Sequence, residues 1–383
     1  MDFDLSEDQR LLQDSLAKLL KDKYGFEQRK AYLKSETGWS REVWAALAEL
    51  GLLGMPFAEE DGGLGYGAIE TMIVTEQLGR SLALEPFIST VVMGGGFLRH
   101  GATAEQRGAL VPQIAEGKLL LAFAHTEPQS RFDLNDVATT AKKEGEGYVI
   151  EGRKGVVVHG DTADQLIVTS RLSGQRRDRD GIGVFLVPAD AKGVSRRGFR
   201  TSDGQRAADI TFDGVKVGAD ALLTGAGGGI ALVERVVDET LAALAAEAVG
   251  CMEAAKDLTV DYLKTRKQFG RPIGSFQALQ HRAAEMMVCL EQARSMAMLA
   301  AMLASEPDAA ERKRQMRAVK IEVGRNARFV GQQTVQMHGG IAMTMEYAGG
   351  HYLKRLTVIE NSFGDMDHHL AALSEEGGVF QAA

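Results

Sequence analysis

The stretch YLKTRKQFGRPIGSFQALQHR, from Tyr262 to Arg282, carries a group of side chains that core packing does not require. A cation, an amide, an aromatic ring, a glycine and a second amide stand close together: Arg266, Gln268, Phe269, Gly270 and Gln277. This set suits an anionic ligand with a flat ring, such as a dinucleotide, because a guanidinium binds phosphate oxygens and a glycine permits close backbone approach. The alternative is an ordinary helix C-terminus, where cations and a terminal glycine are common.

The composition indicates a soluble protein of two or three domains. The chain has 383 residues, of which 45% are hydrophobic and 25% charged, and this length exceeds what one simple core accommodates. A net charge of -8 argues against a general affinity for nucleic acid or anionic membranes. Two cysteines are too few for a disulfide framework or a thiolate zinc site. The first residues are acidic and no run of about 18 apolar residues occurs, so we expect a cytoplasmic protein that does not span a membrane.

The residue pattern changes twice along the chain and predicts three domains. Residues 1–118 read as an N-terminal helical domain, which opens on a capping box formed by Ser6 and Gln9. Residues 119–222 contain short β-branched runs separated by Gly, Asp and Asn, which predicts a middle antiparallel β domain. Residues 223–383 return to long helices and form the third predicted domain.

One carboxylate stands apart on the helix that precedes Tyr262. The charged residues of this helix gather on one side at about 100° per residue, whereas Glu247 faces away from them, among small or apolar neighbours such as Leu244 and Cys251. A buried carboxylate costs several kcal/mol unless it is paired or protonated. Glu247 is therefore either a catalytic base in an apolar pocket or half of an ion pair with a cation from another helix. On the first interpretation, a neutral amide at 247 should fold as well as the carboxylate.

Two further segments end in residues that suit a ligand. In QTVQMHGGIAMTMEY (333–347) a helix ends at His338, and the pair Gly339 and Gly340 permits backbone approach to a ligand, although a plain connection between helices would look similar. In AFAHTEP, Thr126 stands at a strand end. Its hydroxyl could bond a flavin or a thioester carbonyl there, or merely form a turn.

Two other segments imitate ligand sites. The glycine-rich TGAGGG at 224–229 lacks the spacing and the lysine of a phosphate-binding loop, so we expect an interdomain hinge. The tail segment FGDMDHHL contains His368 and His369, but adjacent histidines on a helix point about 100° apart and chelate poorly. We therefore expect no metal site.

Together these segments resemble the acyl-CoA dehydrogenase family over essentially the whole chain. The resemblance rests on five motifs in the family's order: FDLSEDQ, GLLGMPFAEEDGGLGYG, the TEP strand, YLKTRKQFG with FQALQH, and QMHGGIAM. It implies an α+β multidomain fold with an N-terminal α-helical domain, a middle antiparallel β-barrel and a C-terminal four-helix bundle. FAD would lie between the β domain and the bundle of a tetramer. The cofactor-binding residues would be Thr126 at the flavin ring, Arg266, Gln268 and Phe269 at the pyrophosphate with Gln277 in the same segment, and Gln336, Gly339 and Gly340 at the ADP part held by a neighbouring subunit.

The chain also departs from the pattern of the family that it resembles. Most members carry the catalytic Glu late in the chain, at the position where this chain has Gly364 when counted from Arg355, with Asp365 next to it. A minority carry the base on the helix before the YLKTR-like segment, close to Glu247. The motif that usually reads WIT is three valines at 156–158. These departures leave FAD expected and the substrate class open.

The sequence thus predicts a FAD-dependent acyl-CoA dehydrogenase of fatty-acid β-oxidation. Glu247 would remove the α-proton of an acyl-CoA while the β-hydride passes to flavin N5, which gives the trans-2-enoyl-CoA. The resemblance implies that electrons then pass to an electron-transfer flavoprotein. The alternative is a non-catalytic or half-site subunit of a heteromeric acyl-CoA dehydrogenase. We expect a homotetramer, or a heterotetramer with a related subunit, without metal or nucleic acid.

Overall fold

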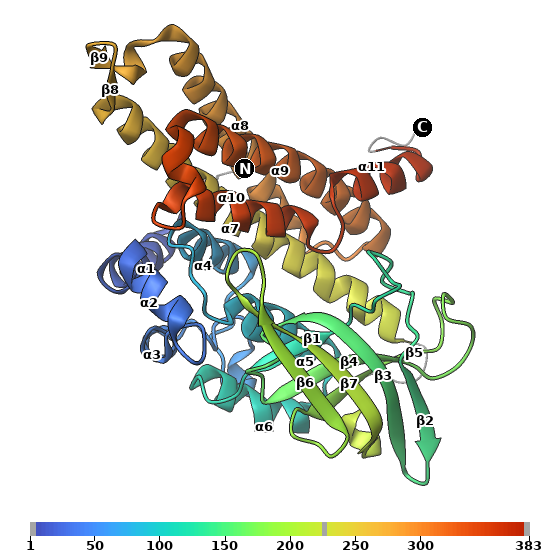
Figure 1. Cartoon of the computed structure of the whole chain (residues 1–383). Helices are drawn as coiled ribbons and strands as arrows, with labels where there is room; N and C mark the ends of the chain where they lie inside the picture. Colours follow the sequence, from blue (N-terminus) through green and yellow to red (C-terminus); the bar gives the residue numbers. More distant parts are fainter. Residues whose placement is uncertain (1–4, 224–227, 379–383) are drawn as a thin grey trace. The chain divides into compact units, whose positions relative to one another are not determined.

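The computed structural model describes residues 5–223 and 228–378, and its N-terminal part is helical (Figure 1). The capping box of Ser6 and Gln9 is confirmed, because each side chain bonds the backbone N–H of the other at the start of the first helix. The elements of this part are α1 (Glu7–Lys23), α2 (Phe26–Lys34), α3 (Arg41–Glu49), η1 (Glu59–Asp61), α4 (Ala68–Arg80), η2 (Ile88–Gly94), α5 (Gly95–Gly101) and α6 (Ala104–Ala115).

The middle part is a curled seven-stranded sheet (Figure 1). Its strands are β1 (Leu121–Ala124), β2 (Thr140–Glu144), β3 (Gly147–Val158), β4 (Gln165–Arg171), β5 (Ile182–Pro188), β6 (Val194–Arg200) and β7 (Arg206–Val217). The order is β1-β4-β2-β3-β7-β6, with β5 paired to β4. The predicted antiparallel pairing holds for most neighbours, but β1 and β2 both pair with β4 in parallel. The parallel pairing is possible because β3 reverses the direction of β2, so that β4, the next strand, runs in the same direction as β2 and β1.

The C-terminal part consists of long helices and confirms the predicted order of helical, β and helical regions. Its elements are α7 (Gly229–Thr265), β8 (Lys267–Gln268), β9 (Arg271–Pro272), η4 (Ile273–Ser275), α8 (Gln277–Leu303), α9 (Ala309–His338), η5 (Gly339–Met343), α10 (Ala348–Asn361) and α11 (Met366–Glu375). Figure 1 shows α8 and α9 side by side, and α9 also packs against α10 and α11. By length and composition α8 could cross a membrane, but the core helix of a soluble protein has the same character. Five of its seven buried residues follow coiled-coil spacing: Met286, Leu290, Ala293, Ala297 and Ala300.

The described chain separates into two compact units that do not follow the order of the elements. One unit combines the chain up to residue 31 and residues 68–83 with the C-terminal helices from residue 241, and the other combines 32–67 with 84–240. The boundary falls within α7. The hinge expected at 224–229 lies mostly outside the described residues, since 224–227 are not described.

Candidate functional site

The end of α7 leads into a tight two-stranded ribbon that carries the aromatic ring singled out in the sequence. Strands β8 and β9 are joined by Phe269 and Gly270, whose φ angles are +53° and +78°. Two consecutive positive φ values are typical of a type I′ hairpin turn. Glycine adopts this conformation without cost, whereas a bulky Phe does so rarely. Phe269 is also 90% exposed, so this residue is both strained and uncovered, a combination that often marks a functional position.

The polar candidates of this segment are exposed as well. Arg266, Gln268 and Gln277 all lie at the surface of the chain. The guanidinium of Arg266 forms no hydrogen bond or ion pair with any of the residues that the structure describes, although its backbone N–H bonds the carbonyl of Tyr262 at 2.8 Å. An exposed cation without a protein partner is available to an anionic ligand.

The C-terminal end of α9 supplies the second group of candidates and lies at the same end of the C-terminal helices. The rings of Tyr262 on α7 and His338 on α9 are 4.5 Å apart between centroids. Gln336, Gly339 and Gly340 are exposed, and Gly339 has a φ of +66°. A Cβ built on either glycine meets nothing within 4 Å, so the backbone here is open to a ligand.

These residues fit the dinucleotide that the sequence predicts. The Arg266 guanidinium and the open backbone of Gly339 and Gly340 suit phosphate oxygens, amide side chains suit ribose and ring edges, and the exposed Phe269 ring suits stacking. The tertiary structure therefore brings seven of the predicted cofactor residues to one end of the C-terminal helices.

Thr126, the eighth predicted cofactor residue, belongs to the other unit. It follows β1 and is exposed, while its neighbours His125 and Glu127 are 6% and 3% exposed. Successive side chains of an extended chain point to opposite sides, so the burial of both neighbours turns Thr126 outward. The backbone N–H of Gly155 donates to the Thr126 carbonyl at 2.8 Å, which joins this strand end to β3.

Glu247 is buried and paired. Its side chain is 5% exposed, and Arg355 of α10 donates to both carboxylate oxygens, from Nε and from Nη2, at 2.6 Å each. Glu247 sits where α4 and α7 approach closely, because a Cβ on Gly79 or Gly250 would strike the backbone of the other helix. The ion pair that the sequence left open as an alternative is thus present. The expectation that a neutral amide would be tolerated at 247 is wrong on this geometry, since it left Arg355 out of account.

The C-terminal turn shows why a side chain would not fit at position 364, where the sequence has glycine. Phe363 and Gly364 have φ angles of +56° and +111°. A Cβ on Gly364 would lie 2.5 Å from Nε2 of His369 and 2.7 Å from Cδ2 of His368. The space of a side chain is thus filled by two imidazole rings. Asp365 caps α11 by accepting the N–H of His368 at 2.8 Å.

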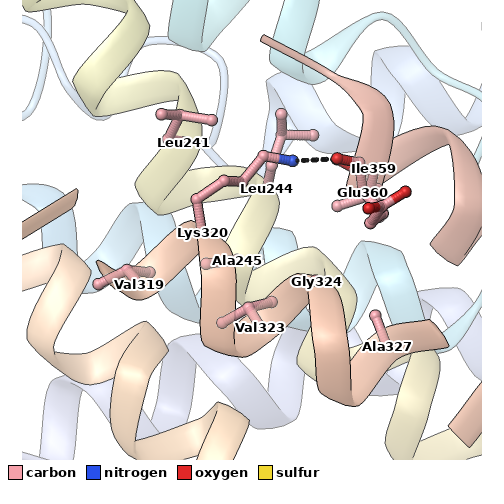
Figure 2. A pocket seen from close by; sticks show the side chains of 10 residues that line it. All are labelled: Leu241, Leu244, Ala245, Val319, Lys320, Val323, Gly324, Ala327, Ile359 and Glu360. Atoms are coloured by element: carbon pink, nitrogen blue, oxygen red, sulfur yellow. Dashed lines mark hydrogen bonds between the residues drawn. The ribbon is translucent and has the colours of Figure 1, made fainter. Parts of the chain in front are cut away.

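A buried lysine holds the end of α10 just before this turn (Figure 2). Lys320 of α9 donates through Nζ to the carbonyls of Ile359 and Glu360 at 2.6 and 2.8 Å. Burial lowers the pKa of Lys320 to about 7, although Glu360 and Asp365 oppose the shift. Figure 2 shows the side chain beside a small cavity between α7, α9 and α10, whose free volume of about 10 Å³ is at the lower limit for one water molecule. This cavity has no room for an acyl chain.

The sequence reasoning missed Arg355 as the partner of Glu247 and Lys154 as a buried cation. Lys154 is fully buried in β3. The alternation of β3 contained the signal, because Ile150 and Lys154 are four residues apart and so lie on the same face of the strand. No comparable local pattern indicated Arg355, which lies on an amphipathic helix rich in polar residues.

Three family models match successive parts of the chain. They are the acyl-CoA dehydrogenase N-terminal domain over residues 6–118, the middle domain over 122–215 and the C-terminal domain over 227–376. Among curated proteins, the probable acyl-CoA dehydrogenase YngJ of Bacillus subtilis is 30% identical, over 94% of this chain and 95% of the length of YngJ. The acyl-CoA dehydrogenase FadE12 of Mycobacterium tuberculosis is 32% identical, over 80% of this chain and 80% of the length of FadE12. Among solved structures, a variant of the steroid ACAD Tcur3481-Tcur3483 is 30% identical, with a TM-score of 0.87 over 97% of this chain and 98% of its own.

Proposed function

Because the chain belongs to the acyl-CoA dehydrogenase family of FAD-binding oxidoreductases, we propose that it oxidises an acyl-CoA to the trans-2-enoyl-CoA. Bound FAD supplies the acceptor for the hydride that leaves the β-carbon. The protein supplies the cofactor site, the groups that orient the thioester and an acceptor for the α-proton. A role in fatty-acid β-oxidation is part of this proposal.

The observation that carries the proposal is the open cationic end of the C-terminal helices. Arg266, Phe269 and the Gly339–Gly340 backbone are all exposed there, and this combination has no evident purpose in an isolated chain. Arg266→Ala should weaken FAD binding at least tenfold, because it removes a charge-assisted contact to phosphate. Fluorescence titration of the flavin-free protein measures this change. Lys264→Ala, an exposed cation two residues earlier on α7, is the matched control and should bind FAD as the wild type does. Unchanged affinity in Arg266→Ala would show that the cofactor is held elsewhere.

We propose Glu247 as the acceptor of the α-proton, and the ion pair defines what this role requires. Arg355 occupies one lone pair on each oxygen of Glu247 and so holds the carboxylate in one orientation, while the second lone pair of each oxygen remains to accept a proton. Glu247→Gln should slow flavin reduction by an acyl-CoA by several orders of magnitude in stopped-flow measurements, because the amide accepts no proton. Asp365→Asn should change the rate by less than about tenfold, since Asp365 caps α11. Flavin reduction that survives Glu247→Gln would remove Glu247 from the reaction.

A second candidate function is favoured by two specific observations. Both oxygens of Glu247 are engaged by Arg355, and position 364 is closed to a side chain. A chain with this geometry suits the half-site subunit of a heteromeric dehydrogenase, whose related partner contributes the base. The name of the related steroid ACAD joins two designations, Tcur3481 and Tcur3483.

Assembly and electron transfer complete the proposal. We propose a tetramer, because the exposed apolar residues near the candidate cofactor site need a cover: Phe269, Ile341, Met343 and Met345. We propose an electron-transfer flavoprotein as the acceptor of the electrons. Native mass spectrometry of the purified chain, combined with a visible spectrum, separates the alternatives. A homotetramer with one FAD per chain supports the complete enzyme, whereas a chain that binds FAD only with a second subunit supports the half-site function.

A further inference from the structure

A lysine and a glutamate form a fully enclosed ion pair in the core of the β sheet, next to the strand end that carries Thr126. Lys154 of β3 and Glu127 are 2.7 Å apart between Nζ and Oε1, and their side chains are 0% and 2% exposed. Removing two charges from water costs several kcal/mol for each ion, and an apolar pair of similar size is often as stable. Such a pair therefore calls for an explanation other than stability.

Glu127 organises the loop that follows Thr126. Besides Lys154, its carboxylate accepts hydrogen bonds from the backbone N–H of Ala138 at 2.8 Å, from that of Thr139 at 3.0 Å, and from Nε2 of Gln129 at 2.7 Å. Burial raises the pKa of Glu127, but the charge and hydrogen bond of Lys154 outweigh it and lower the pKa to about 2. The carboxylate is thus charged in the folded protein and holds both ends of the loop between β1 and β2.

Lys154 forms a hydrogen bond with His125, the residue before Thr126. Its Nζ donates to the carbonyl of His125 at 3.2 Å and to the Thr169 hydroxyl at 3.0 Å, so three acceptors take the three ammonium protons. Nδ1 of His125 also lies 3.0 Å from the Thr169 hydroxyl. Both neighbours of Thr126 are therefore held by one buried cation, and the exposed Thr126 side chain is fixed between two anchored residues.

The same lysine begins the irregular segment of β3 that lies beside Thr126. The pairing of β3 with β7 shifts register between Lys154 and Val157, and Val156 has a φ of +52° and is 53% exposed. The hydrogen bond from Gly155 N–H to the Thr126 carbonyl ties this bulge to the strand end. The valines at 156–158 stand where the family motif reads WIT. Lys154 thus connects Thr126, which the resemblance places at the flavin ring, with the segment where the family motif reads WIT.

We propose that Lys154 and Glu127 are positioning residues, which hold Thr126 and the bulge at 155–157 in the geometry that contacts the flavin ring. This inference rests on the proposed function, because it takes Thr126 as the flavin contact. It predicts that the ion pair affects the flavin only through Thr126 and the bulge, since neither charged side chain is exposed.

The test compares FAD binding and the visible spectrum of the flavin in matched variants. Lys154→Met alone leaves the charge of Glu127 buried and should lower Tm, so the informative variant is the double change Lys154→Met with Glu127→Gln. The double variant should recover part of the lost Tm, because the amide keeps one acceptor oxygen for the backbone N–H groups of Ala138 and Thr139. It should bind FAD at least tenfold more weakly and show an altered flavin spectrum. Thr126→Ala should alter the same spectrum. Lys216→Met, which removes an exposed sheet cation that pairs with Glu144, is the control and should match the wild type.

Additivity decides between positioning and an unrelated effect. If the pair acts through Thr126, Thr126→Ala should cause a smaller loss of FAD affinity in the double variant than in the wild type. A double variant with wild-type affinity and spectrum, while Thr126→Ala changes both, would overturn the positioning role and leave the proposed site intact. Thr126→Ala without any effect on flavin affinity or spectrum would overturn the site at Thr126 and this inference with it. A double variant that fails to fold would show that the pair is required for stability and would contradict the positioning role.

Discussion

Replacing Glu247 by Gln should destabilise the protein strongly, and Arg355 is the reason. The side chains of Glu247 and Arg355 are 5% and 8% exposed and share two hydrogen bonds of 2.6 Å. The amide places an NH₂ group against the guanidinium and removes the negative charge that Glu247 supplies to the buried Arg355. Breaking a buried pair in this way costs about 3–5 kcal/mol, a large part of the 5–15 kcal/mol that holds a typical domain together.

The assay is urea denaturation of the purified protein, followed by circular dichroism and by flavin fluorescence. The double variant Glu247→Leu with Arg355→Met removes both charges and should recover most of the loss. Glu291→Gln on α8 is the control, because its carboxylate is 53% exposed and lies 3.8 Å from Arg294, and it should cost less than about 1 kcal/mol. A loss below about 1 kcal/mol in Glu247→Gln, or a double variant as unstable as the single one, would refute this reasoning.

Three further predictions concern the end of α10 and the turn after it. Gly364→Glu should add no activity and should lower Tm, because its Cβ would lie 2.5 Å from the His369 ring. Gly214→Ala, at a φ of +62° with nothing within 4 Å of its Cβ, is the control for a side chain at a positive φ without a clash. A gain of activity in Gly364→Glu would show that the turn can open. Asp365→Ala should lower the free energy of unfolding by about 1 kcal/mol, because the N-cap of α11 is lost, whereas Asp365→Asn should lower it little, since Asn caps equally well. Equal losses of stability for the two variants in a melting experiment would contradict a capping role. The pKa of Lys320 is about 7 in the folded protein and lies below its value in the unfolded chain. The unfolded chain therefore binds more protons between about pH 7 and 10. The free energy of unfolding should rise with pH in that range, by at most about 1.4 kcal/mol per pH unit for one proton. Lys320→Met should flatten that rise in denaturation curves, and a slope identical to that of the wild type would contradict the buried amine.

Much of the architecture is written in local sequence patterns. The capping box at Ser6 specifies a helix start because its partner, Gln9, is three residues away. The helical pattern of residues 1–118 agrees with α1 to α6, and short β-branched runs locate the sheet. The cofactor candidates could also be recognised from a local pattern, because Arg266, Phe269 and Gly270 stand in one short segment. Their roles in binding FAD stay predictions, as does a cytoplasmic location.

The partners of buried charges could not be predicted from the sequence. Glu247 was recognisable as a carboxylate on an apolar stripe, yet its cation lies 108 residues away on α10. Lys154 and Glu127 meet across 27 residues through strand pairing, and the imidazoles that close position 364 depend on the turn between α10 and α11. Local patterns determine which face of a helix or strand is buried, because that depends on a fixed period along the chain. Which groups meet on the buried faces depends on how helices and strands pack, so only the tertiary structure shows whether a buried charge is paired.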